Sequence, residues 1–220
     1  MEKSLPEPIV LFGGSFDPVH YGHLRAVQEA AEQLGVEQVK LLPCHIPPHK
    51  ESLKASVSQR LHMLQLAIAE QPNLSVDTWE LEQPKASYTL NTLKRYRASY
   101  GDEISLIFLM GWDSLQSLPS WYHWQELAEL SNFAVWRRPG YSELNHQVQA
   151  WLDTRLSEVA DLKNQSSGHV CFLQTTPLDV SSSAVRNGDA MNTELLPESV
   201  YRYIRECNLY QTKAGKMNVN

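Results

Sequence analysis

Residues 12–25 read Phe-Gly-Gly-Ser-Phe-Asp-Pro-Val-His-Tyr-Gly-His-Leu-Arg, and this stretch decides the fold that the sequence predicts. The apolar residues 9–12 lead into it and are typical of a short, buried parallel strand. Gly13 and Gly14 are expected to end the strand, because a glycine lets the backbone turn without a Cβ clash. A phosphate group can approach such a turn closely, so the stretch is a candidate anion site.

A helix is expected directly after this turn. Apolar residues recur at helical spacing, at Leu24, Val27, Ala30, Ala31 and Leu34. The helix therefore begins near Gly22, where unpaired main-chain N–H groups favour anions, and ends at Gly35. His20 and His23 then point into the same anion site. A Gly-Gly pair followed by Asp-Pro is also typical of an ordinary loop, so the glycines alone are weak support for this interpretation.

The composition of the 220-residue chain predicts one compact domain. Hydrophobic residues make up 42% of it and charged residues 20%, which suits a full core. We expect a single domain over residues 1–220, with an ordered core over about 8–210 and a frayed tail at 211–220. The formal net charge of -6 excludes a broad basic footprint for nucleic acid. Local positive groups must therefore hold any anionic substrate.

Cysteines and apolar runs bear on the cellular compartment. Cys44, Cys171 and Cys207 are far apart and form no Cys-x-x-Cys pair or zinc-type spacing. No protein-held metal site is expected, and a reducing cytoplasm suits these thiols. The N-terminal residues lack the apolar core of a signal peptide, and no run reaches the roughly eighteen apolar residues of a membrane span. The sequence predicts a cytoplasmic protein without a membrane partner and leaves the oligomeric state open.

Strand-like and helix-like segments alternate along the chain. Strands are expected at residues 38–42, 74–81, 104–110, 133–137 and 170–173. Helices are expected at residues 59–69, 88–100, 121–130, 144–156 and 197–207. This alternation predicts an α/β fold with a parallel sheet and right-handed crossovers. Ser56 and Gln59 match a capping box, and the polar residues 163–168 are expected to form a surface loop.

A second candidate phosphate site lies near the end of the chain. Val180-Ser181-Ser182-Ser183-Ala184-Val185-Arg186 follows a strand and is expected to open a short helix. Its hydroxyl and N–H groups would then face one way, with Arg186 about one turn later. A serine-rich helix start is usually only an N-cap, and an arginine in a first turn is usually solvated. The pairing with the first motif favours a functional interpretation.

Both motifs resemble those of one protein family. The first resembles the (T/H)xGH motif and the second the ISSTxxR motif of the nucleotidyltransferase superfamily, whose members transfer a nucleoside monophosphate from a triphosphate. The resemblance implies a Rossmann-like, doubly wound parallel sheet with helices on both faces. It implies that His20, His23 and Arg186 are catalytic. The ATP-binding residues that it implies are Gly13, Gly14, Ser15, Phe16, Gly22, Ser181, Ser182 and Ser183.

Four strings in the middle of the chain bear on the second substrate. They are the stiff, basic loop at residues 43–50, Ser87-Tyr88-Thr89, Gly111-Trp112-Asp113-Ser114 and Pro119-Ser120-Trp121-Tyr122. The second and fourth are expected to begin helices, and the third follows a strand at the edge where ligands of open α/β sheets bind. Taken singly, each string has an ordinary explanation as a core tryptophan, a helix cap, a turn aspartate or a loop histidine.

In their order and spacing, these strings and Arg137-Arg138-Pro139-Gly140 closely resemble the bacterial nicotinate mononucleotide adenylyltransferase family, from Val10 to about Tyr210. The resemblance implies that ATP and nicotinate mononucleotide (NaMN) give nicotinate adenine dinucleotide (NaAD) and pyrophosphate, a step of NAD biosynthesis. Mg²⁺ would be held mainly by the ATP phosphates, with no dedicated protein ligands.

The same resemblance implies how the second substrate is bound. Trp121 would stack on the pyridine ring, and main-chain N–H groups near Thr89 and Tyr122 would bind the nicotinate carboxylate. Two helix N-termini that converge there would favour the acid over the amide. Arg138 would hold the mononucleotide phosphate, and Asp113 the adenylate portion or its ribose. The full set of implied residues adds His49 and Tyr88 on the NaMN side and Gly111 on the ATP side.

Two departures from the family pattern stand out. Cys44 occupies a position where relatives often carry asparagine, and a thiol is a much weaker hydrogen-bond partner than an amide; the neighbouring His45 is a possible compensation. Asn187-Gly188-Asp189 follows Arg186 at once, where relatives carry a longer helical stretch. The first departure removes Cys44 from the expected site residues, and the second leaves the local helix length open.

Three other functions are compatible with parts of the sequence. A phosphopantetheine adenylyltransferase would be shorter and would lack the Ser-Tyr-Thr and Pro-Ser-Trp-Tyr strings. A class I aminoacyl-tRNA synthetase fragment would be basic and belong to a far longer chain. A non-catalytic nucleotide sensor would keep the fold without the chemistry, which the joint presence of His20, His23 and Arg186 disfavours. A pyrophosphate-release assay separates an enzyme from a sensor.

Overall fold

The structure is a computed structural model that describes residues 6–47, 53–137, 143–176, 178–188 and 191–210. Its centre is one sheet in which the strands follow the order β3-β2-β1-β4-β5-β6, and every neighbouring pair is parallel. The strands are β1 Ile9–Gly14, β2 Val39–Pro43, β3 Leu74–Val76, β4 Leu106–Gly111, β5 Asn132–Arg137 and β6 Val170–Gln174. This is the strand order of the classic doubly wound Rossmann arrangement, so the predicted fold class is confirmed.

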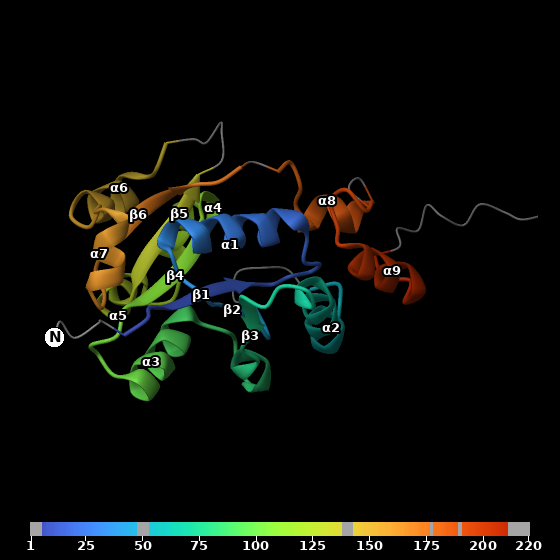
Figure 1. Cartoon of the computed structure of the whole chain (residues 1–220), viewed down its shortest axis with the longest axis horizontal. Coiled ribbons are helices and arrows are strands. Elements are labelled where there is room, and N and C mark those ends of the chain that lie inside the picture. The colour runs from blue at the N-terminus through green and yellow to red at the C-terminus, as the bar shows by residue number, and fades with distance from the viewer. Residues whose placement is uncertain (1–5, 48–52, 138–142, 177, 189–190, 211–220) are drawn as a thin grey trace, which may run out of the picture.

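Helices connect successive strands and cover both faces of the sheet. They are α1 Tyr21–Leu34, α2 Val57–Ile68, α3 Thr89–Tyr100, α4 Trp112–Gln116, α5 Leu127–Leu130, α6 His146–Asp153, α7 Val159–Asn164, α8 Ser182–Asn187 and α9 Glu198–Glu206. Three single turns of 3₁₀ helix accompany them, η1 Trp79–Glu82, η2 Leu118–Ser120 and η3 Trp124–Glu126. Figure 1 shows α1 on one side of β1 and α3 on the other.

Two buried clusters fill the two faces of the sheet. Val10 and Phe12 of β1 point into the cluster that contains α1, α2, α7, α8 and α9. Leu11 points into the opposite cluster, which contains α3, α4, α5 and α6. Because side chains alternate along a strand, a central strand that is buried on both faces is apolar at every position. The run at residues 9–12 has this property.

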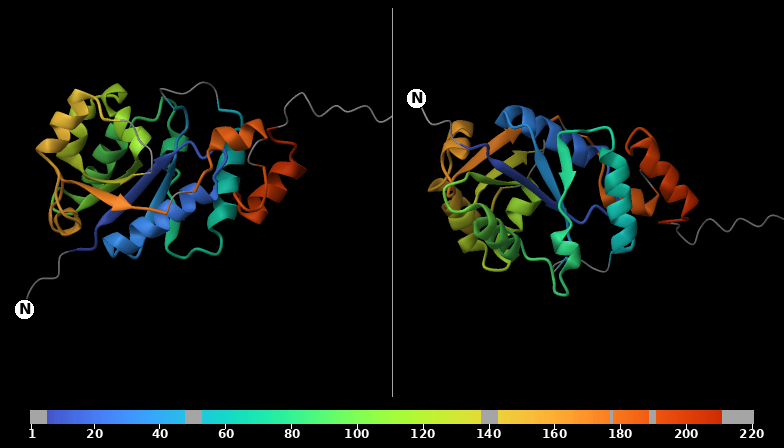
Figure 2. Two further views of the ribbon diagram at one scale, coloured as in Figure 1. Left: turned by 90° about the horizontal axis from the view of Figure 1, so that it is seen from above. Right: turned by 60° about the horizontal axis from the view of Figure 1, so that its bottom comes forward.

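The end of the chain returns to the carboxyl edge of the first half of the sheet. α9 packs against α2, and Figure 2 shows the two helices side by side in both views. The buried residues Val200 and Ile204 join α9 to the cluster around α1. The last helix is therefore part of the same core as the first motif, rather than an appendage.

The predicted elements differ from the structure at four places. Residues 74–81 were expected to form one strand, but β3 ends at Val76 and η1 follows it. The helix expected at residues 121–130 is split into η3 and α5. The helix expected at 144–156 is shortened to α6. α7, which was not expected, ends at Asn164 and so overlaps only the start of the surface loop expected at residues 163–168. In each case local apolar spacing did not reveal where the chain turns away from the sheet.

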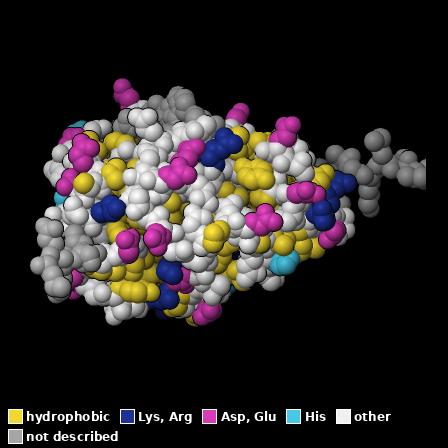
Figure 3. Space-filling model, in the orientation of Figure 1, with side chains coloured by type: hydrophobic (Ala, Val, Ile, Leu, Met, Phe, Trp, Pro, Cys, Tyr) yellow, Lys and Arg dark blue, Asp and Glu magenta, His cyan; other side chains and the backbone are white. Residues whose placement is uncertain are grey.

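The helix ends follow the sequence closely elsewhere. Ser56 caps α2 by accepting the N–H of Gln59, as the capping box predicts. Gly35 ends α1 in the left-handed conformation, with φ of 59°. No helix within the described residues has the length and apolar character that a membrane crossing needs. On the face shown in Figure 3, acidic and basic side chains are interspersed.

Candidate active site

The two motif histidines lie at the N-terminal end of α1. His20 is the N-cap residue, with an extended backbone and only 2% of its surface exposed. The main-chain N–H of His20 donates to Nδ1 of His23 at 3.3 Å, and the two rings stack with their centroids 3.7 Å apart. Because Nδ1 of His23 is the acceptor, the neutral ring carries its proton on Nε2. His23 is therefore held as a hydrogen-bond donor.

Close packing, rather than backbone conformation, explains the glycines of the first motif. A Cβ on Gly22 would lie 2.9 Å from Nδ1 of His20 and 2.9 Å from Cγ1 of Val180. A Cβ on Gly14 would lie 2.9 Å from the Phe16 ring. β1 includes Gly13 and ends at Gly14, so the strand ends within the glycine pair, as predicted. The residue with a positive φ, 46°, is Phe16.

A buried arginine ties the first motif to the segment after β2. Arg60 of α2 is fully buried, and its guanidinium donates to the main-chain oxygens of Ser15 at 2.8 Å and Cys44 at 2.7 Å. The sequence analysis missed this residue. Arg60 has the helical spacing of the buried Met63 and Ala67, and a charged residue on a buried helix face needs internal partners. That spacing is the signal that would have identified it.

Cys44 and His45, whose roles the sequence does not settle, both make hydrogen bonds through their main-chain N–H groups. The main-chain N–H of Cys44 donates to the oxygen of Gly14 at 3.0 Å, so its backbone role does not depend on a side-chain amide. The N–H of His45 donates to Oγ of Ser87 at 2.9 Å. Nδ1 of His45 lies 2.6 Å from the main-chain oxygen of Gln83, and because a carbonyl only accepts, this nitrogen carries the proton.

The second motif is docked directly on the first. Nη1 of Arg186 donates to the main-chain oxygen of Asp17 at 2.7 Å, and Nη2 donates to Oγ of Ser183 at 2.9 Å. Oγ of Ser182 donates to the main-chain oxygen of Pro18 at 2.9 Å. Segments about 165 residues apart in the sequence thus share one site, because hydrogen bonds join Asp17 and Pro18 to Arg186 and Ser182.

The three serine hydroxyls do not face one way, as the sequence analysis expected. Ser181 caps α8 by accepting the N–H of Ala184 at 3.1 Å, whereas Ser182 bonds to the first motif. Ser181 and Ser183 are exposed, and Ser182 is half-buried. The short helix itself is confirmed, and it ends at Gly188, whose φ is 91°. The hydroxyls serve as a cap, a tie to the first motif and an acceptor for Arg186.

A cavity of about 340 Å³ opens beside the first motif. It lies at the carboxyl ends of β1, β2 and β4, where the strand order changes direction and ligands of doubly wound sheets bind. The sequence-predicted residues that line it are Gly13, Gly14, Ser15, Tyr88, Thr89, Trp121 and Tyr122. The structure therefore brings together both ends of the predicted site, from residues that lie about a hundred positions apart.

Aromatic side chains form one wall of the cavity. Trp121 is half-buried and meets Phe108 edge-on, with ring centroids 6.1 Å apart. The rings of Tyr88 and Tyr122 are 4.7 Å apart, and Tyr122 is 48% exposed. Thr89 is the first residue of α3, as predicted. The helix start expected at residues 119–122 is wrong, because η2 ends at Ser120 and Trp121 and Tyr122 lie in the connection that follows.

A buried acid, missed by the sequence analysis, lies behind this wall. Glu80 of η1 also lines the cavity, and its Oε1 accepts the hydroxyl of Thr92 at 2.6 Å. Burial raises the pKa of Glu80, and the hydrogen bonds from Thr92 and Ser87 only partly oppose this. The sequence does not reveal Glu80, because its spacing predicts that residues 74–81 form a strand. No pattern in the sequence distinguishes it from the neighbouring Glu82, which is exposed.

A second acid, Asp77, lies in the same region, and its pKa is shifted in the opposite direction. Oδ2 of Asp77 accepts from Nη1 of Arg95 at 2.7 Å and from the Tyr96 hydroxyl at 2.6 Å, and its Oδ1 accepts the Trp79 N–H at 2.9 Å. Burial by itself would raise the pKa of Asp77, but these three hydrogen bonds and the positive charge outweigh it and lower the pKa. The Asp77 carboxylate therefore stays ionised and anchors α3 behind the cavity wall.

The remaining predicted residues lie at the margin of the described site. Asp113 is exposed in the first turn of α4. Gly111 precedes it, and a Cβ there would lie 3.1 Å from Nε1 of Trp136. His49 and Arg138 lie outside the described residues. Among the described residues, no group of three or more His, Cys, Asp and Glu side chains is placed to hold a metal ion.

Comparisons with known proteins agree with this geometry. The cytidylyltransferase-like family model matches residues 11–188. A protein of Yersinia pestis named "Probable nicotinate-nucleotide adenylyltransferase" is 40% identical over 208 residues, covering 91% of this chain and 94% of the relative. A protein of the same name from Escherichia coli O157:H7 is 39% identical, covering 91% and 97%.

A solved structure shares the fold. The Plasmodium falciparum nicotinic acid mononucleotide adenylyltransferase complexed with NaAD superposes with a TM-score of 0.70, at 18% identity, covering 93% of this chain and 98% of that one. This likeness supports the doubly wound architecture, and the closer sequence relatives support the finer assignment. The chain belongs to the cytidylyltransferase-like family and, within it, to the nicotinate-nucleotide adenylyltransferases.

Proposed function

We propose that this chain transfers the adenylyl group of ATP to NaMN, giving NaAD and pyrophosphate. The observation that carries the proposal is the docking of the Arg186 motif on the His20–His23 motif, beside a cavity walled by Thr89, Trp121 and Tyr122. A triphosphate site and a site for a flat acidic ring thus adjoin at the edge of one sheet. The relatives named as nicotinate-nucleotide adenylyltransferases support the same reaction.

The reaction needs alignment rather than a covalent enzyme intermediate. A phosphate oxygen of NaMN forms a bond to the α-phosphorus of ATP, and the bond to the bridging oxygen breaks, so that pyrophosphate leaves with its charge. Catalysis of such a transfer rests on positioning and on donors aimed at the developing charge. His20 and His23 are proposed to donate to the α- and β-phosphate oxygens. In His23 the donor is Nε2, because Nδ1 accepts the main-chain N–H of His20.

Arg186 is proposed to hold the leaving pyrophosphate. A guanidinium has five N–H donors, and the bonds to Asp17 and Ser183 occupy two of them. The remaining donors can chelate phosphate oxygens, for which the planar guanidinium is well suited. Gly13, Gly14, Ser15, Phe16, Gly22 and Ser181–Ser183 are proposed to surround the phosphates. Gly111 and Asp113 are proposed on the adenosine side.

The NaMN end is proposed to occupy the aromatic part of the cavity. The N-terminus of α3 at Thr89 supplies a partial positive charge at this wall. Together with the main-chain N–H near Tyr122, it favours a nicotinate carboxylate over a neutral amide. Trp121 and Tyr88 are proposed to contact the pyridine ring, and His49 and Arg138 the mononucleotide phosphate.

Three further assignments belong to this proposal. Mg²⁺ would be carried by the ATP phosphates, where its charge offsets that of the phosphate oxygens. We assign the 220 residues to a single nucleotidyltransferase domain, working in the cytoplasm on ATP and NaMN. Neither nucleic acid nor a membrane is a proposed partner. The net charge of -6 supports this, because non-specific nucleic-acid binding depends on basic surface.

The test compares two acceptors in parallel. The chain is incubated with ATP and either NaMN or nicotinamide mononucleotide, and pyrophosphate and dinucleotide are measured. We expect a higher kcat/KM for the acid, because the site at Thr89 gains from a charge that the amide lacks. Equal turnover of the two acceptors contradicts the acid specificity, and no pyrophosphate from either contradicts the proposed reaction.

A further inference from the structure

Tyr210, the last described residue of the chain, contacts the first motif. Its hydroxyl donates to Oδ1 of Asp17 at 2.7 Å, across 193 positions of sequence. The ring packs at the border of the core cluster that contains α1 and α9. Asp17 stands in the middle of the stretch between the glycines and the histidines. A C-terminal side chain therefore reaches a catalytic motif that lies near the N-terminus.

The chain turns sharply to make this contact. After α9, the N–H of Leu209 donates to the oxygen of Ile204 at 3.0 Å. Asn208 and Tyr210 have φ angles of 52° and 60°, in the left-handed region that non-glycine residues rarely adopt. Such backbone strain persists only where surrounding contacts hold it. Here the partly buried Tyr210–Asp17 hydrogen bond is one of those contacts.

The Asp17 carboxylate collects donors from separate segments. Only 1% of Asp17 is exposed. Besides Tyr210, the main-chain N–H groups of Lys54 and Ala55 donate to it at 2.8 and 3.1 Å. These two residues lie just before α2. A carboxylate held by three donors has little freedom to move, so the backbone of Asp17 is fixed as well.

The fixed backbone of Asp17 in turn holds Arg186. The main-chain oxygen of Asp17 accepts from Nη1 of Arg186 at 2.7 Å. Hydrogen bonds thus lead from Tyr210 through both polar groups of Asp17 to the guanidinium that is proposed to hold the β- and γ-phosphates. Burial raises the pKa of Tyr210, and the Asp17 carboxylate adds to the effect. The hydroxyl therefore stays protonated and remains a donor.

We propose that Tyr210 is a positioning residue for the triphosphate site, acting on Arg186 through Asp17. This inference rests on the proposed role of Arg186 in phosphate binding. Removing the hydroxyl leaves the carboxylate with one donor fewer, frees the backbone of Asp17 and loosens the guanidinium. The loss falls on the β- and γ-phosphates, because these are the groups that Arg186 is proposed to hold. Groups that ATP shares with AMP are unaffected.

The test measures equilibrium binding of ATP and of AMP to the full chain and to Tyr210→Phe. Phenylalanine keeps the ring and removes only the hydroxyl. We expect ATP to bind about three- to tenfold more weakly, a change typical of one lost interaction, with AMP affinity unchanged. A purely structural role would weaken both nucleotides together and lower the melting temperature, which is measured on the same samples.

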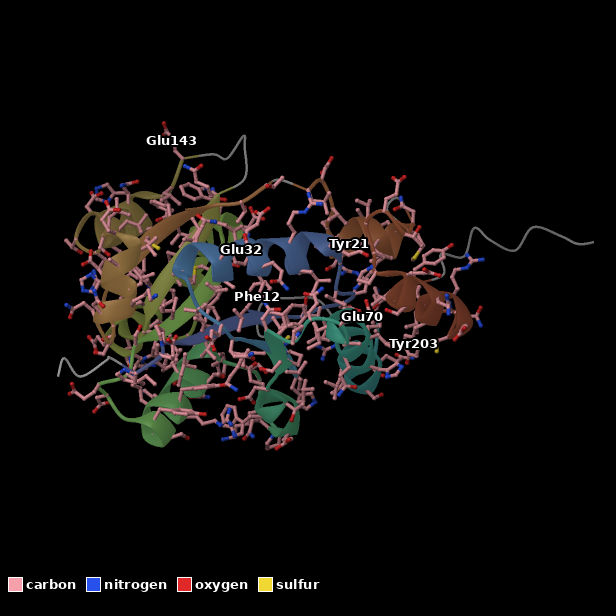
Figure 4. The ribbon with its side chains drawn as sticks, viewed as in Figure 1. Phe12, Tyr21, Glu32, Glu70, Glu143 and Tyr203 are labelled. Carbon is pink, nitrogen blue, oxygen red and sulfur yellow. The ribbon has the colours of Figure 1, made fainter. Side chains whose placement is uncertain are left out.

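Tyr203→Phe is the matched control. Tyr203 lies on α9, where its ring contacts His62 of α2 and its hydroxyl bonds to Cys207, outside both motifs. Figure 4 labels it beside α9, away from Phe12 of β1 and Tyr21 of α1. This variant removes a hydroxyl from the same segment and should bind ATP like the unmodified chain. A loss of ATP affinity equal to that of Tyr210→Phe would overturn the proposal.

The Arg186→Ala background tests the path through Arg186. If Tyr210 acts on that guanidinium, Tyr210→Phe should weaken ATP binding no further in a chain that already lacks it. A full additional loss would overturn the proposal. ATP binding needs no acceptor substrate, so this inference is tested even if NaMN is the wrong acceptor. Conversely, turnover of NaMN by the unmodified chain tests the proposed function without reference to Tyr210.

Discussion

His23 is held in one tautomer by a single main-chain hydrogen bond. Nδ1 accepts the N–H of His20 at 3.3 Å, which leaves Nε2 as the donor toward the phosphates. The same arrangement stacks the ring on His20, so the side chain has little room to turn. A donor that is already oriented before the reaction does not have to reorganise as charge develops. The position of His23 in the first turn of α1 is what makes this possible.

His23→Ala should lower kcat by about 10²–10³, the usual cost of losing one donor to developing charge. ATP binding should change little, because the Arg186 side of the site is intact. Steady-state kinetics and ATP binding on the same variant measure the two quantities. A kcat within a few-fold of that of the unmodified chain would remove His23 from the catalytic residues.

A substitution at Trp121 tests the proposed role of the aromatic wall in binding NaMN. It is half-buried, meets Phe108 in a T-shaped contact and lines the cavity in which a planar ring is proposed to bind. Trp121→Ala should raise KM for NaMN and leave KM for ATP nearly unchanged, since a stacking contact contributes about 0.5–1.5 kcal/mol beyond area burial. A core tryptophan would instead cost about 3–5 kcal/mol of stability on truncation. Thermal melting alongside kinetics separates the two, and a large stability loss without a selective KM effect would exclude stacking.

At the scale of whole elements, α2 serves as a brace for the two loops that meet at the cavity. Its buried Arg60 donates to main-chain oxygens after β1 and after β2. Its N-terminal flank, at Lys54 and Ala55, donates to Asp17. One helix therefore fixes both the first motif and the segment around Cys44. The sequence predicts the helix, but not that its buried face carries this arginine toward the site.

Arg60→Met should lower the free energy of unfolding by about 2–4 kcal/mol, because it leaves the partly buried carbonyls of Ser15 and Cys44 without their donor. Methionine fills a similar volume, so the lost hydrogen bonds dominate over packing. Chemical denaturation measures the change. Arg202→Met is the control: Arg202 pairs with Glu198 on the exposed face of α9 and should contribute nothing measurable. Equal free energies of unfolding for the two variants would show that the hydrogen bonds of Arg60 do not stabilise the fold.

Elements with regular apolar spacing could be predicted from the sequence, and those that end early could not. The strands around residues 9–12 and 104–110 and the helix before Gly35 agree with the structure to within a few residues. The prediction that the strand continues past Val76 is wrong, because Trp79 and Leu81 continue the strand-like pattern although the chain has already turned into η1. Periodicity reports burial, and a 3₁₀ turn packed on the sheet buries the same residue types.

The site follows the same division. Residues inside contiguous motifs, such as His20, Thr89 and Trp121, could be proposed from the sequence because their neighbours mark them. Arg60 and Tyr210 were missed because their partners lie 45 and 193 positions away. A hydrogen bond between distant segments leaves no local pattern in either segment, so only the fold reveals it. The positions within motifs were predictable, and the supports that hold the motifs in place were not.

At the scale of the whole molecule, stability should depend on pH through two neighbouring acids with opposite shifts. Hydrogen bonds and the charge of Arg95 lower the pKa of Asp77 from its ordinary value of 3.8, against the effect of burial. Burial raises the pKa of Glu80 from its ordinary value of 4.5. Both acids flank the cavity wall, and Tyr96, Thr92, Ser87 and Arg95 are the groups that face them. Each acid couples folding to proton binding with its own sign.

The Asp77 contribution is present above pH 3.8 and is lost as the pH falls through the lowered folded-state pKa, because the unfolded chain then binds the extra proton. The Glu80 contribution runs the other way: it is complete below pH 4.5 and is lost as the pH rises through the raised folded-state pKa.

Asp77→Asn should therefore lower the melting temperature most at neutral pH and least in strong acid. The melting temperature of Glu80→Gln, relative to that of the unmodified chain, should be highest at neutral pH and lowest below pH 4.5, because glutamine never has to lose a proton. Melting curves of the three proteins between strong acid and neutrality measure both effects, and parallel curves for all three would show that neither acid is coupled to folding.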